Sequence, residues 1–304
     1  MVKMKYYILI LLLTAIPFSA VLAQDEEEAD KPVRFPFASG YLIDNQTTLI
    51  PVPGTLEFVM QHKFGSIENG MTDFLGIYSP GANIRLGLNY VPVTNLQFGL
   101  GLSKDNMFTD LNAKWTIVEQ TRQNTIPVAV ALYGVLAVDG RNPNEIGSGL
   151  VTHSDDGDNR YSISFTDRWS YFSQLIISRK FTERLSLQAG ASFTHYNMVD
   201  PGFDHDKIGV HFSGRYNFSP QSSLIFNYDI PLEIQEISEQ REVPEHHEPN
   251  LSVGWEISTS THAFQIYVGN SRSLLPQEIM MRNSNGIDFD NLAFGFVITR
   301  LWNF

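Results

Sequence analysis

A histidine and a serine in the second half of this sequence could act together as a base and a nucleophile. His211 and Ser213 stand two positions apart, a spacing that lipid-cleaving enzymes of membranes use, and Asn217 and Asn227 follow nearby. A serine nucleophile needs such a base because its free hydroxyl reacts poorly. For that chemistry both side chains would have to face the lipid that they cleave.

Asp155, Asp156 and Asp158 form an acidic turn that could bind a metal ion. Carboxylate oxygens are the hard ligands that Ca²⁺ prefers. The turn lacks the spacing and the terminal glutamate of a dedicated calcium loop, so a solvated acidic turn is the simpler interpretation.

A second acidic region surrounds a pair of histidines. Glutamate recurs at every third position from 233 to 248, and His246 and His247 lie within this stretch. Asp204 and Asp206 form a similar cluster around a histidine. Together they could concentrate divalent cations or bridge lipopolysaccharide through such ions, and a charged, solvated surface is again the simpler alternative.

Composition removes several other kinds of site. The chain of 304 residues has no cysteine, so it has no disulfide, thiolate zinc site or thiol nucleophile. The net charge of -12 argues against a nucleic-acid partner, which calls for a basic patch. Phosphate-binding loops, His-Glu-x-x-His and Gly-x-Ser-x-Gly are absent, and the sequence predicts neither a cofactor nor an enzyme.

The elements that must carry these residues are strands. Leu56, Phe58 and Met60 alternate with polar residues at the strand period of two. Most such segments span roughly the 9–11 residues that a tilted strand needs to cross a bilayer. Twelve of them follow one another along the chain: 54–64, 82–90, 95–103, 110–118, 127–138, 169–181, 185–196, 207–218, 223–232, 250–258, 262–270 and 291–304.

The links between the segments alternate between short turns and long polar loops. Short turns at one rim, long loops at the other and an even strand number are typical of an outer-membrane barrel. A sheet in hydrocarbon must close, because each unpaired edge group costs several kcal/mol. The sequence therefore predicts an all-β, transmembrane, antiparallel up-and-down barrel of about twelve strands; the alternative is a soluble secreted β-protein.

The two ends of the chain indicate where the barrel is delivered. Residues 1–23 combine a basic start, an apolar run and small residues before a cleavage position near Ala23, as in a secretory signal peptide. An uncleaved anchor is the alternative. The last strand ends in Trp302 and Phe304, the terminal aromatic pattern read by the outer-membrane insertion machinery. Residues 24–53 would then form a periplasmic segment and possible lumen plug, and 54–304 the barrel.

Several motifs resemble an uncharacterised family of Gram-negative outer-membrane β-barrels, filed as a domain of unknown function. The similarity is strongest over residues 47–130. Members usually carry Arg where this chain has Lys63, and a further Arg near Ser103. The motifs are Gln61–Gly65, Phe74–Gly76, Gly81–Tyr90, Leu96–Gly101, Lys114 and Pro127–Val128. The resemblance implies a barrel in the outer membrane and carries no established activity.

If the apolar faces contact lipid, the polar faces line the lumen. The charged lumenal candidates are Lys63, Arg85, Lys114, His211, Arg215, Asp229 and Glu256. A mixture of signs favours internal ion pairs over a pore of one sign, and twelve strands enclose a lumen between a filled and an open one. We expect a narrow channel or binding lumen for an unknown small solute, in contact with outer-membrane lipid and lipopolysaccharide. The alternative is a plugged structural or interaction barrel that presents acidic extracellular loops, and a lipid-modifying enzyme comes third.

Overall fold

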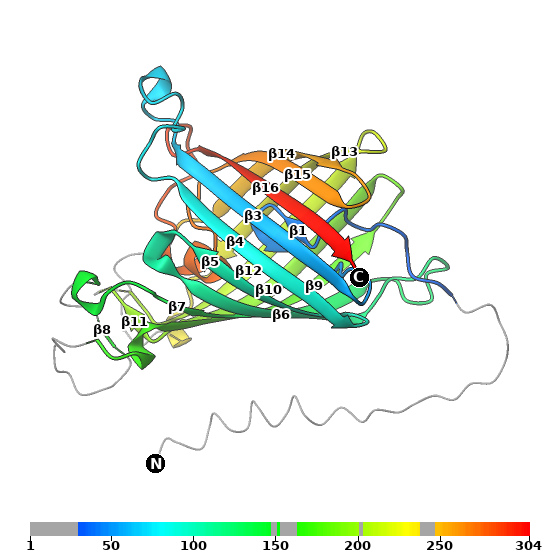
Figure 1. Ribbon diagram of the computed structural model, residues 1–304, viewed down its shortest axis with the longest axis horizontal. Coiled ribbons are helices and arrows are strands. Elements are labelled where there is room, and N and C mark those ends of the chain that lie inside the picture. The colour runs from blue at the N-terminus through cyan, green and yellow to red at the C-terminus, as the bar shows by residue number, and fades with distance from the viewer. Residues whose placement is uncertain (1–29, 147–150, 153–162, 201–202, 238–246) are drawn as a thin grey trace, which may run out of the picture.

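The computed structural model describes residues 30–146, 151–152, 163–200, 203–237 and 247–304. Their dominant feature is one closed, antiparallel barrel of twelve strands (Figure 1). Its strands are β3 (Thr55–Ser66), β4 (Asn83–Val93), β5 (Leu96–Ser103), β6 (Thr109–Val118), β7 (Ala129–Val138), β9 (Trp169–Lys180), β10 (Leu185–Tyr196), β12 (Asp206–Asn217), β13 (Ser222–Pro231), β14 (Asn250–Ser258), β15 (His262–Gly269) and β16 (Ala293–Asn303).

The barrel closes where its first and last strands meet. β3 pairs with β16 over most of its length, with Val59 opposite Thr299, and β9 pairs with β10 on the other side. The twelve expected segments coincide with the twelve strands to within a few residues, so the predicted fold is confirmed. Closure leaves no sheet edge unpaired, as backbone in hydrocarbon requires.

Side chains alternate between the two faces of the wall along most of each strand. On the outside Leu88, Leu100 and Trp115 are about half exposed, at 49%, 46% and 50%. Inside, Asp110 and Asn227 are fully buried. The apolar positions of each strand therefore face outward and the polar positions face inward, as expected for a barrel wall in lipid.

Two rims follow from the link lengths. Residues 94–95, 181–184, 218–221 and 259–261 make short turns at the rim where the last strand ends, and we call this the short-turn rim. The opposite long-loop rim carries the extended links. The smaller elements of the links are the strands β8 (Val151–Thr152) and β11 (Met198–Val199) and the 3-10 helices η1 (Gly70–Thr72), η2 (Asp105–Met107), η3 (Pro143–Glu145), η4 (Thr166–Arg168) and η5 (Gln235–Ile237).

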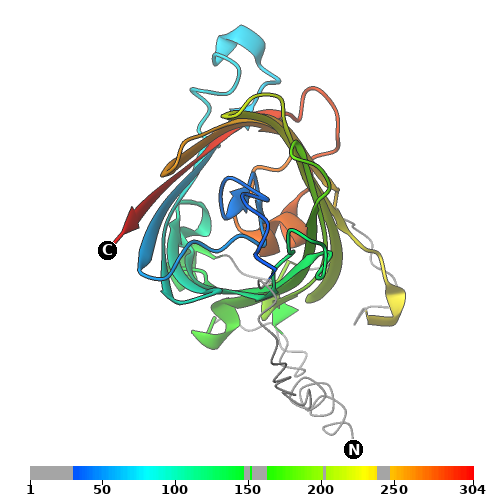
Figure 2. The ribbon, with the colours of Figure 1, turned by 90° about the vertical axis from the view of Figure 1, so that its right-hand side faces the viewer.

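Two segments from opposite rims lie inside the ring of strands. The N-terminal hairpin, β1 (Tyr41–Leu42) paired with β2 (Asn45–Gln46), enters from the short-turn rim, and residues 41–48 are buried throughout. The helix α2 (Pro276–Arg282) descends from the link between β15 and β16. Figure 2 looks into the barrel and shows the blue hairpin and the orange helix within the lumen.

Residues 271–290 form one of the long polar loops that the sequence predicts between its last two strands. The structure places part of this loop inside the barrel. Gln277 to Met281 are all buried. A seven-residue helix has too weak a period for a sequence argument to find. None of the helices in the described part of the chain is long and apolar enough to cross a membrane.

Candidate functional site: the filled lumen

The N-terminal hairpin turns sharply at the centre of the barrel. Its turn residues are Ile43 and Asp44, and Ile43 has a φ of 55°. A β-branched side chain rarely adopts this left-handed conformation, which costs roughly 1–3 kcal/mol. Gln265 of the wall holds the turn, because its side chain accepts from the Ile43 N–H at 2.8 Å and donates to the Tyr41 carbonyl at 2.9 Å. The wall therefore stabilises a strained turn.

Asp44 ties the tip of the hairpin to β3. The Lys63 ammonium lies 2.8 and 2.9 Å from the two Asp44 carboxylate oxygens, and both side chains are 1% exposed. Asn250 of β14 donates to the same carboxylate at 3.1 Å. Asp44 thus supplies the counter-charge of Lys63 and connects the hairpin to two distant strands, β3 and β14.

The second strand of the hairpin binds another buried wall cation. Lys114 of β6 donates to the Gln46 side chain at 3.0 Å, and Gln188 of β10 donates to the Gln46 carbonyl at 2.8 Å. Two residues further on, the Thr48 hydroxyl lies 2.6 Å from the Ser178 hydroxyl of β9. The hairpin is therefore hydrogen-bonded to the wall around much of the barrel's circumference.

Asp229 is a hub for amide donors. Asn45 of the hairpin donates to one of its oxygens at 2.7 Å, and Asn227 and Asn250 of the wall donate to the other at 2.7 and 2.8 Å. The His211 ring lies 2.8 Å from the first oxygen. A buried carboxylate surrounded by donors in this way is stabilised in its charged form.

The remaining charged candidates pair within the wall. Arg85 of β4 binds Asp110 of β6 with two parallel N–H donors at 2.8 and 2.7 Å. Arg215 of β12 binds Glu256 of β14 at 2.7 Å. Each pair skips one strand and so links strands that are not hydrogen-bonded neighbours. All seven charged lumenal candidates are buried inside the barrel, where they form ion pairs and hydrogen bonds with the wall or the hairpin.

The helix α2 packs against an apolar part of the wall. Ile279, Met280 and Met281 pack with Phe172 and Ile176 of β9 in one buried cluster. The α2 segment belongs to the β15–β16 link of the long-loop rim, whereas the hairpin precedes β3, which begins at the short-turn rim.

Glu278 is a buried acidic residue among the apolar contacts of α2. Burial raises the pKa of its carboxyl to about 7, and the nearby Asp105 and Asp139 act in the same direction. Arg282 and a hydrogen bond from Asn106 at 3.2 Å oppose that shift. Its other oxygen has no hydrogen-bond partner. The helix therefore carries a carboxyl group that titrates near neutral pH.

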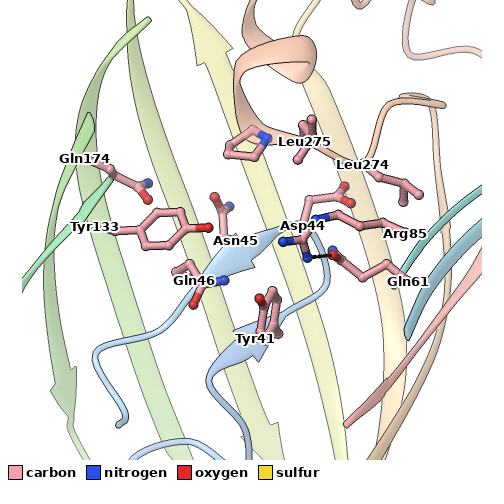
Figure 3. Close-up of a pocket in the computed structure, with 11 residues that line it drawn as sticks. Tyr41, Asp44, Asn45, Gln46, Gln61, Arg85, Tyr133, Gln174, Leu274 and Leu275 are labelled. Carbon is pink, nitrogen blue, oxygen red and sulfur yellow. Dashed lines mark hydrogen bonds between the residues drawn. The ribbon is translucent and has the colours of Figure 1, made fainter. Parts of the chain in front are cut away.

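The hairpin and the α2 segment almost meet at the centre of the barrel. The space between them is about 10 Å³, which is about the room for one water molecule. Figure 3 shows Asp44, Asn45 and Gln46 below this space, Leu274 and Leu275 above it, and Arg85, Tyr133 and Gln174 at its sides. In this conformation the lumen is closed.

The histidine-serine pair suggested by the sequence does not form, and another serine takes its place. His211 contacts Ser192 of β10 at 2.7 Å on one ring nitrogen and Asp229 at 2.8 Å on the other. This order of groups is that of a hydrolase triad. Ser192 is 5% exposed, and its hydroxyl and the Met280 sulfur of α2 both border the space beside Gly209. With both faces of this network inside the closed lumen, we interpret it as a structural network.

The metal-binding candidates are only partly described. Asp155, Asp156, Asp158 and His246 lie outside the described residues. The Asp206 carboxylate lies 2.6 Å from the His195 ring, and the His205 ring contacts the Tyr196 carbonyl. His247 stacks on Phe203. Within the part of the chain that the structure describes, no three His, Asp or Glu side chains are arranged to hold a metal ion.

The candidate insertion residues lie at the short-turn rim. Trp302 is the last aromatic of β16 and faces outward beneath the Arg300 guanidinium, 4.9 Å away. Phe304 is 88% exposed, and its N–H donates to the Gly54 carbonyl. Both are accessible at the end of the strand that closes the barrel.

Sequence reasoning missed most of the groups that fill the lumen. Asp44, Asn45, Gln46, Gln277 and Glu278 lie outside the barrel strands, so strand periodicity gave no reason to select them. The one available signal was the position of residues 34–53 directly before the first strand. Ser192 was missed because its partner is on a neighbouring strand, and strand register is not readable from single residues.

A closed antiparallel barrel with a lipid-facing outer wall and a polar interior defines a membrane-bound β-barrel protein of the outer-membrane type. The chain belongs to the family described as membrane bound beta barrel domain (DUF5777), whose model matches residues 37–302. The resemblance seen in the sequence is thereby confirmed, and it covers nearly the whole barrel.

The fold is similar to that of one solved outer-membrane channel, and two other such structures align at lower scores. The COG4313 outer membrane channel from Pseudomonas putida F1 aligns with a TM-score of 0.50 at 15% identity, over 84% of this chain and 97% of that one. The KdgM porin aligns at 0.42 and 9% identity, over 82% and 99%. A deltaS2 mutant of the TodX monoaromatic hydrocarbon channel aligns at 0.37 and 10%, over 84% and 92%. Among curated protein sequences, none matches this chain.

Proposed function

We propose that this protein is a gated outer-membrane channel for small polar solutes and that the structure is its closed state. The N-terminal hairpin is the gate at the short-turn rim, and α2 is the gate at the long-loop rim. Short turns face the periplasm in such barrels, so the hairpin would move toward the periplasm.

The polar part of the hairpin's contact with the wall carries this proposal. The hairpin binds the wall through amides, hydroxyls and one ion pair, contributed by Asp44, Asn45, Gln46 and Thr48. Each hydrogen bond exchanged for one with water changes the free energy by only about 0.5–1.5 kcal/mol. The hairpin also packs Leu42 and Ile43 in an apolar cluster with Val59 of the wall, and these contacts oppose its release. The polar contacts add little to that cost, and the part of the wall that they uncover is hydrophilic.

The opened wall would select solutes by hydrogen bonding. Lys63, Lys114 and Asp229 would each lose a hairpin partner and could replace part of a solute's hydration shell. Acidic long loops would bias entry toward cations. We propose no cofactor; a divalent cation in the loops stays a prediction.

The cellular context proposed for the channel follows from the sequence. We propose that residues 1–23 direct export and are cleaved near Ala23, and that the barrel enters the outer membrane of a Gram-negative cell through the insertion machinery. Its partners there would be outer-membrane lipid and lipopolysaccharide, with no role in binding nucleic acid. Residues 24–53 would reach from the periplasm into the lumen.

A disulfide lock tests the hairpin gate. The Thr48 and Ser178 hydroxyl oxygens lie 2.6 Å apart, close to the roughly 2.03–2.05 Å of an S–S bond, and the chain has no native cysteine. We expect Thr48→Cys/Ser178→Cys to give no conductance in planar bilayers when oxidised and to recover the wild-type openings when reduced. The Thr48→Cys single variant is the control and should not respond to reductant.

The same experiment can contradict the proposal of a gated channel. Equal conductance in the oxidised and reduced states would place the path outside the hairpin's part of the lumen. Absence of openings in the wild type and in the reduced variant would favour the second candidate, a permanently plugged barrel that displays its loops. The observation in favour of that candidate is the space of about 10 Å³ left between the two plugs.

A further inference from the structure

A basic cleft opens at the short-turn rim. Its volume is about 490 Å³, and it is bounded by three segments: the lead into the hairpin, the β6–β7 link and the β9–β10 turn. Four cations line it, Arg34, Arg122, Arg179 and Lys180, with Glu183 as the single lining carboxylate. In a chain of net charge -12, this local excess of positive charge attracts an anion.

An apolar groove continues from the cleft along the outside of the barrel. The groove has a volume of about 350 Å³ and shares Arg179 and Phe181 with the cleft. Ala189 supplies a small side chain between larger ones, and the apolar walls are formed by Val128, Ile177, Leu187, Phe212 and Phe226. The groove lies on the lipid-facing side of the wall, so a hydrocarbon chain bound in it is not exposed to water.

Arg179 stands at the junction of the two spaces. It follows the lipid-facing Ile177 on the same face of β9, and its guanidinium lies 5.4 Å from the centre of the Phe181 ring. Its Nε is buried and has no hydrogen-bond partner. The rest of the Arg179 side chain lines both spaces, so its guanidinium can donate to a ligand that supplies acceptor oxygens.

The neighbouring cations are held in place by the protein. Lys180 donates to the Arg34 carbonyl at 3.2 Å and to Glu183 at 2.7 Å, and Arg122 donates to the Pro32 carbonyl through Nε at 3.0 Å. These contacts attach the lead segment to the rim and leave the cations directed at the same cleft. The site is therefore assembled before any ligand arrives.

We propose that the cleft and groove together bind one phospholipid of the periplasmic leaflet, with its phosphate at Arg179 and an acyl chain in the groove. Guanidinium groups bind phosphate oxygens through paired N–H donors. A cationic cleft alone would hold a free phosphate equally well, and a groove alone would hold any hydrocarbon chain. Only an amphiphile with a phosphate head uses both spaces, and this inference does not depend on whether the lumen conducts.

Binding to the full chain in detergent micelles tests the site, with native mass spectrometry as the readout. The probes are phosphatidylglycerol, diacylglycerol, which has the chains without the phosphate, and inorganic phosphate. We expect phosphatidylglycerol to bind at least tenfold more tightly than either of the other two. Arg179→Gln, which removes the charged donor, and Ala189→Phe, which fills the groove, should each weaken it by at least tenfold.

Arg300→Gln is the matched control. Arg300 is also an outward-facing arginine at the short-turn rim with an aromatic neighbour, but it lines neither space. Its variant should bind phosphatidylglycerol as the wild type does. The proposal fails if Arg179→Gln binds like the wild type while folded. It also fails if inorganic phosphate binds as tightly as the lipid, which would indicate a soluble anion, or if diacylglycerol does, which would indicate hydrocarbon binding alone.

Discussion

Lys63 of the barrel wall and Asp44 of the N-terminal hairpin form an ion pair at 2.8 Å, with both side chains 1% exposed. The pair joins a strand that spans the membrane to a segment that precedes the barrel in the chain. Each charge is buried only because the other is present, since an isolated buried charge is strongly unfavourable. The pair therefore couples occupancy of the lumen to the electrostatics of its wall.

Removing one member of this pair should release the hairpin. Asp44→Asn leaves Lys63 buried without a counter-charge, and breaking a buried pair in this way costs about 3–5 kcal/mol. We expect amide hydrogen exchange of residues 41–46 to accelerate at least a hundredfold. Asp44→Asn/Lys63→Met should restore most of the protection, and Glu183→Gln, at an exposed pair, should change nothing. Unchanged protection in Asp44→Asn would show that the pair does not hold the hairpin.

Docking of α2 should weaken as pH rises through about 7. The pKa of Glu278 is raised from 4.5 to about 7 in the docked helix, so the docked state binds a proton more readily than the solvated one. The favourable contribution of this proton is complete below pH 4.5 and lost above about 7. The difference corresponds to an upper value of about 3 kcal/mol.

Burial of the Glu278 carboxyl sets the direction of this effect, and the charged groups near it modify its size. Asp105 and Asp139 of the adjoining links raise its pKa, and Arg282 of the same helix lowers it. Channel openings measured from about pH 4.5 to 8 should increase with pH in the wild type and be independent of pH in Glu278→Gln. Glu236→Gln, at an exposed position, should keep the wild-type profile. A profile unaffected by Glu278→Gln would assign the titration to another group.

A methyl group at Gly101 should disturb the Arg85–Asp110 pair. A Cβ built at this position collides with side-chain atoms of both partners. Overpacking of this kind costs about 1–3 kcal/mol. Urea unfolding in micelles should show that loss for Gly101→Ala. Gly134→Ala should be neutral, because its nearest contact is the Phe172 carbonyl at 3.7 Å; equal stability of the two variants would show that the ion pair does not pack tightly against Gly101.

Deletion of Phe304 should reduce assembly into the membrane without destabilising the finished barrel. Its side chain is 88% exposed and packs little against the barrel. The amount of heat-modifiable barrel in membranes should fall several-fold in cells, while the purified variant should unfold as the wild type does. Phe289→Ser, at another exposed aromatic in a link, is the control. Normal assembly without Phe304 would exclude it as an insertion signal.

The serine that contacts His211 should be unreactive. Ser192 is 5% exposed inside the closed lumen, so a fluorophosphonate probe should not label the wild type. Labelling that is lost in Ser192→Ala and retained in Ser213→Ala would instead identify a nucleophile and return an enzyme to consideration. Labelling lost only in Ser213→Ala would contradict the contact between His211 and Ser192.

Strand periodicity was sufficient to predict the barrel. Each strand faces lipid on one side and the polar interior on the other, and this contrast shows in the polarity of neighbouring residues. Leu88 and Asn89 differ in polarity because one faces lipid and the other the interior, and this contrast is visible from neighbouring residues alone. Loop lengths then assigned the two rims. The hub at Asp229 could not be found in this way, because it draws donors from residues 45, 211, 227 and 250.

The amino-acid sequence by itself determined a closed, lipid-facing barrel of twelve strands with a charged interior, because hydrocarbon imposes alternation and closure on every strand. Only the tertiary structure decided that this interior is filled. Whether a polar wall faces water or a plug depends on contacts such as Lys63 with Asp44 and Gln265 with Ile43, which join residues from separate segments. The sequence of the wall does not distinguish between these two partners, because water and a plug residue can satisfy the same hydrogen-bonding groups of a wall side chain.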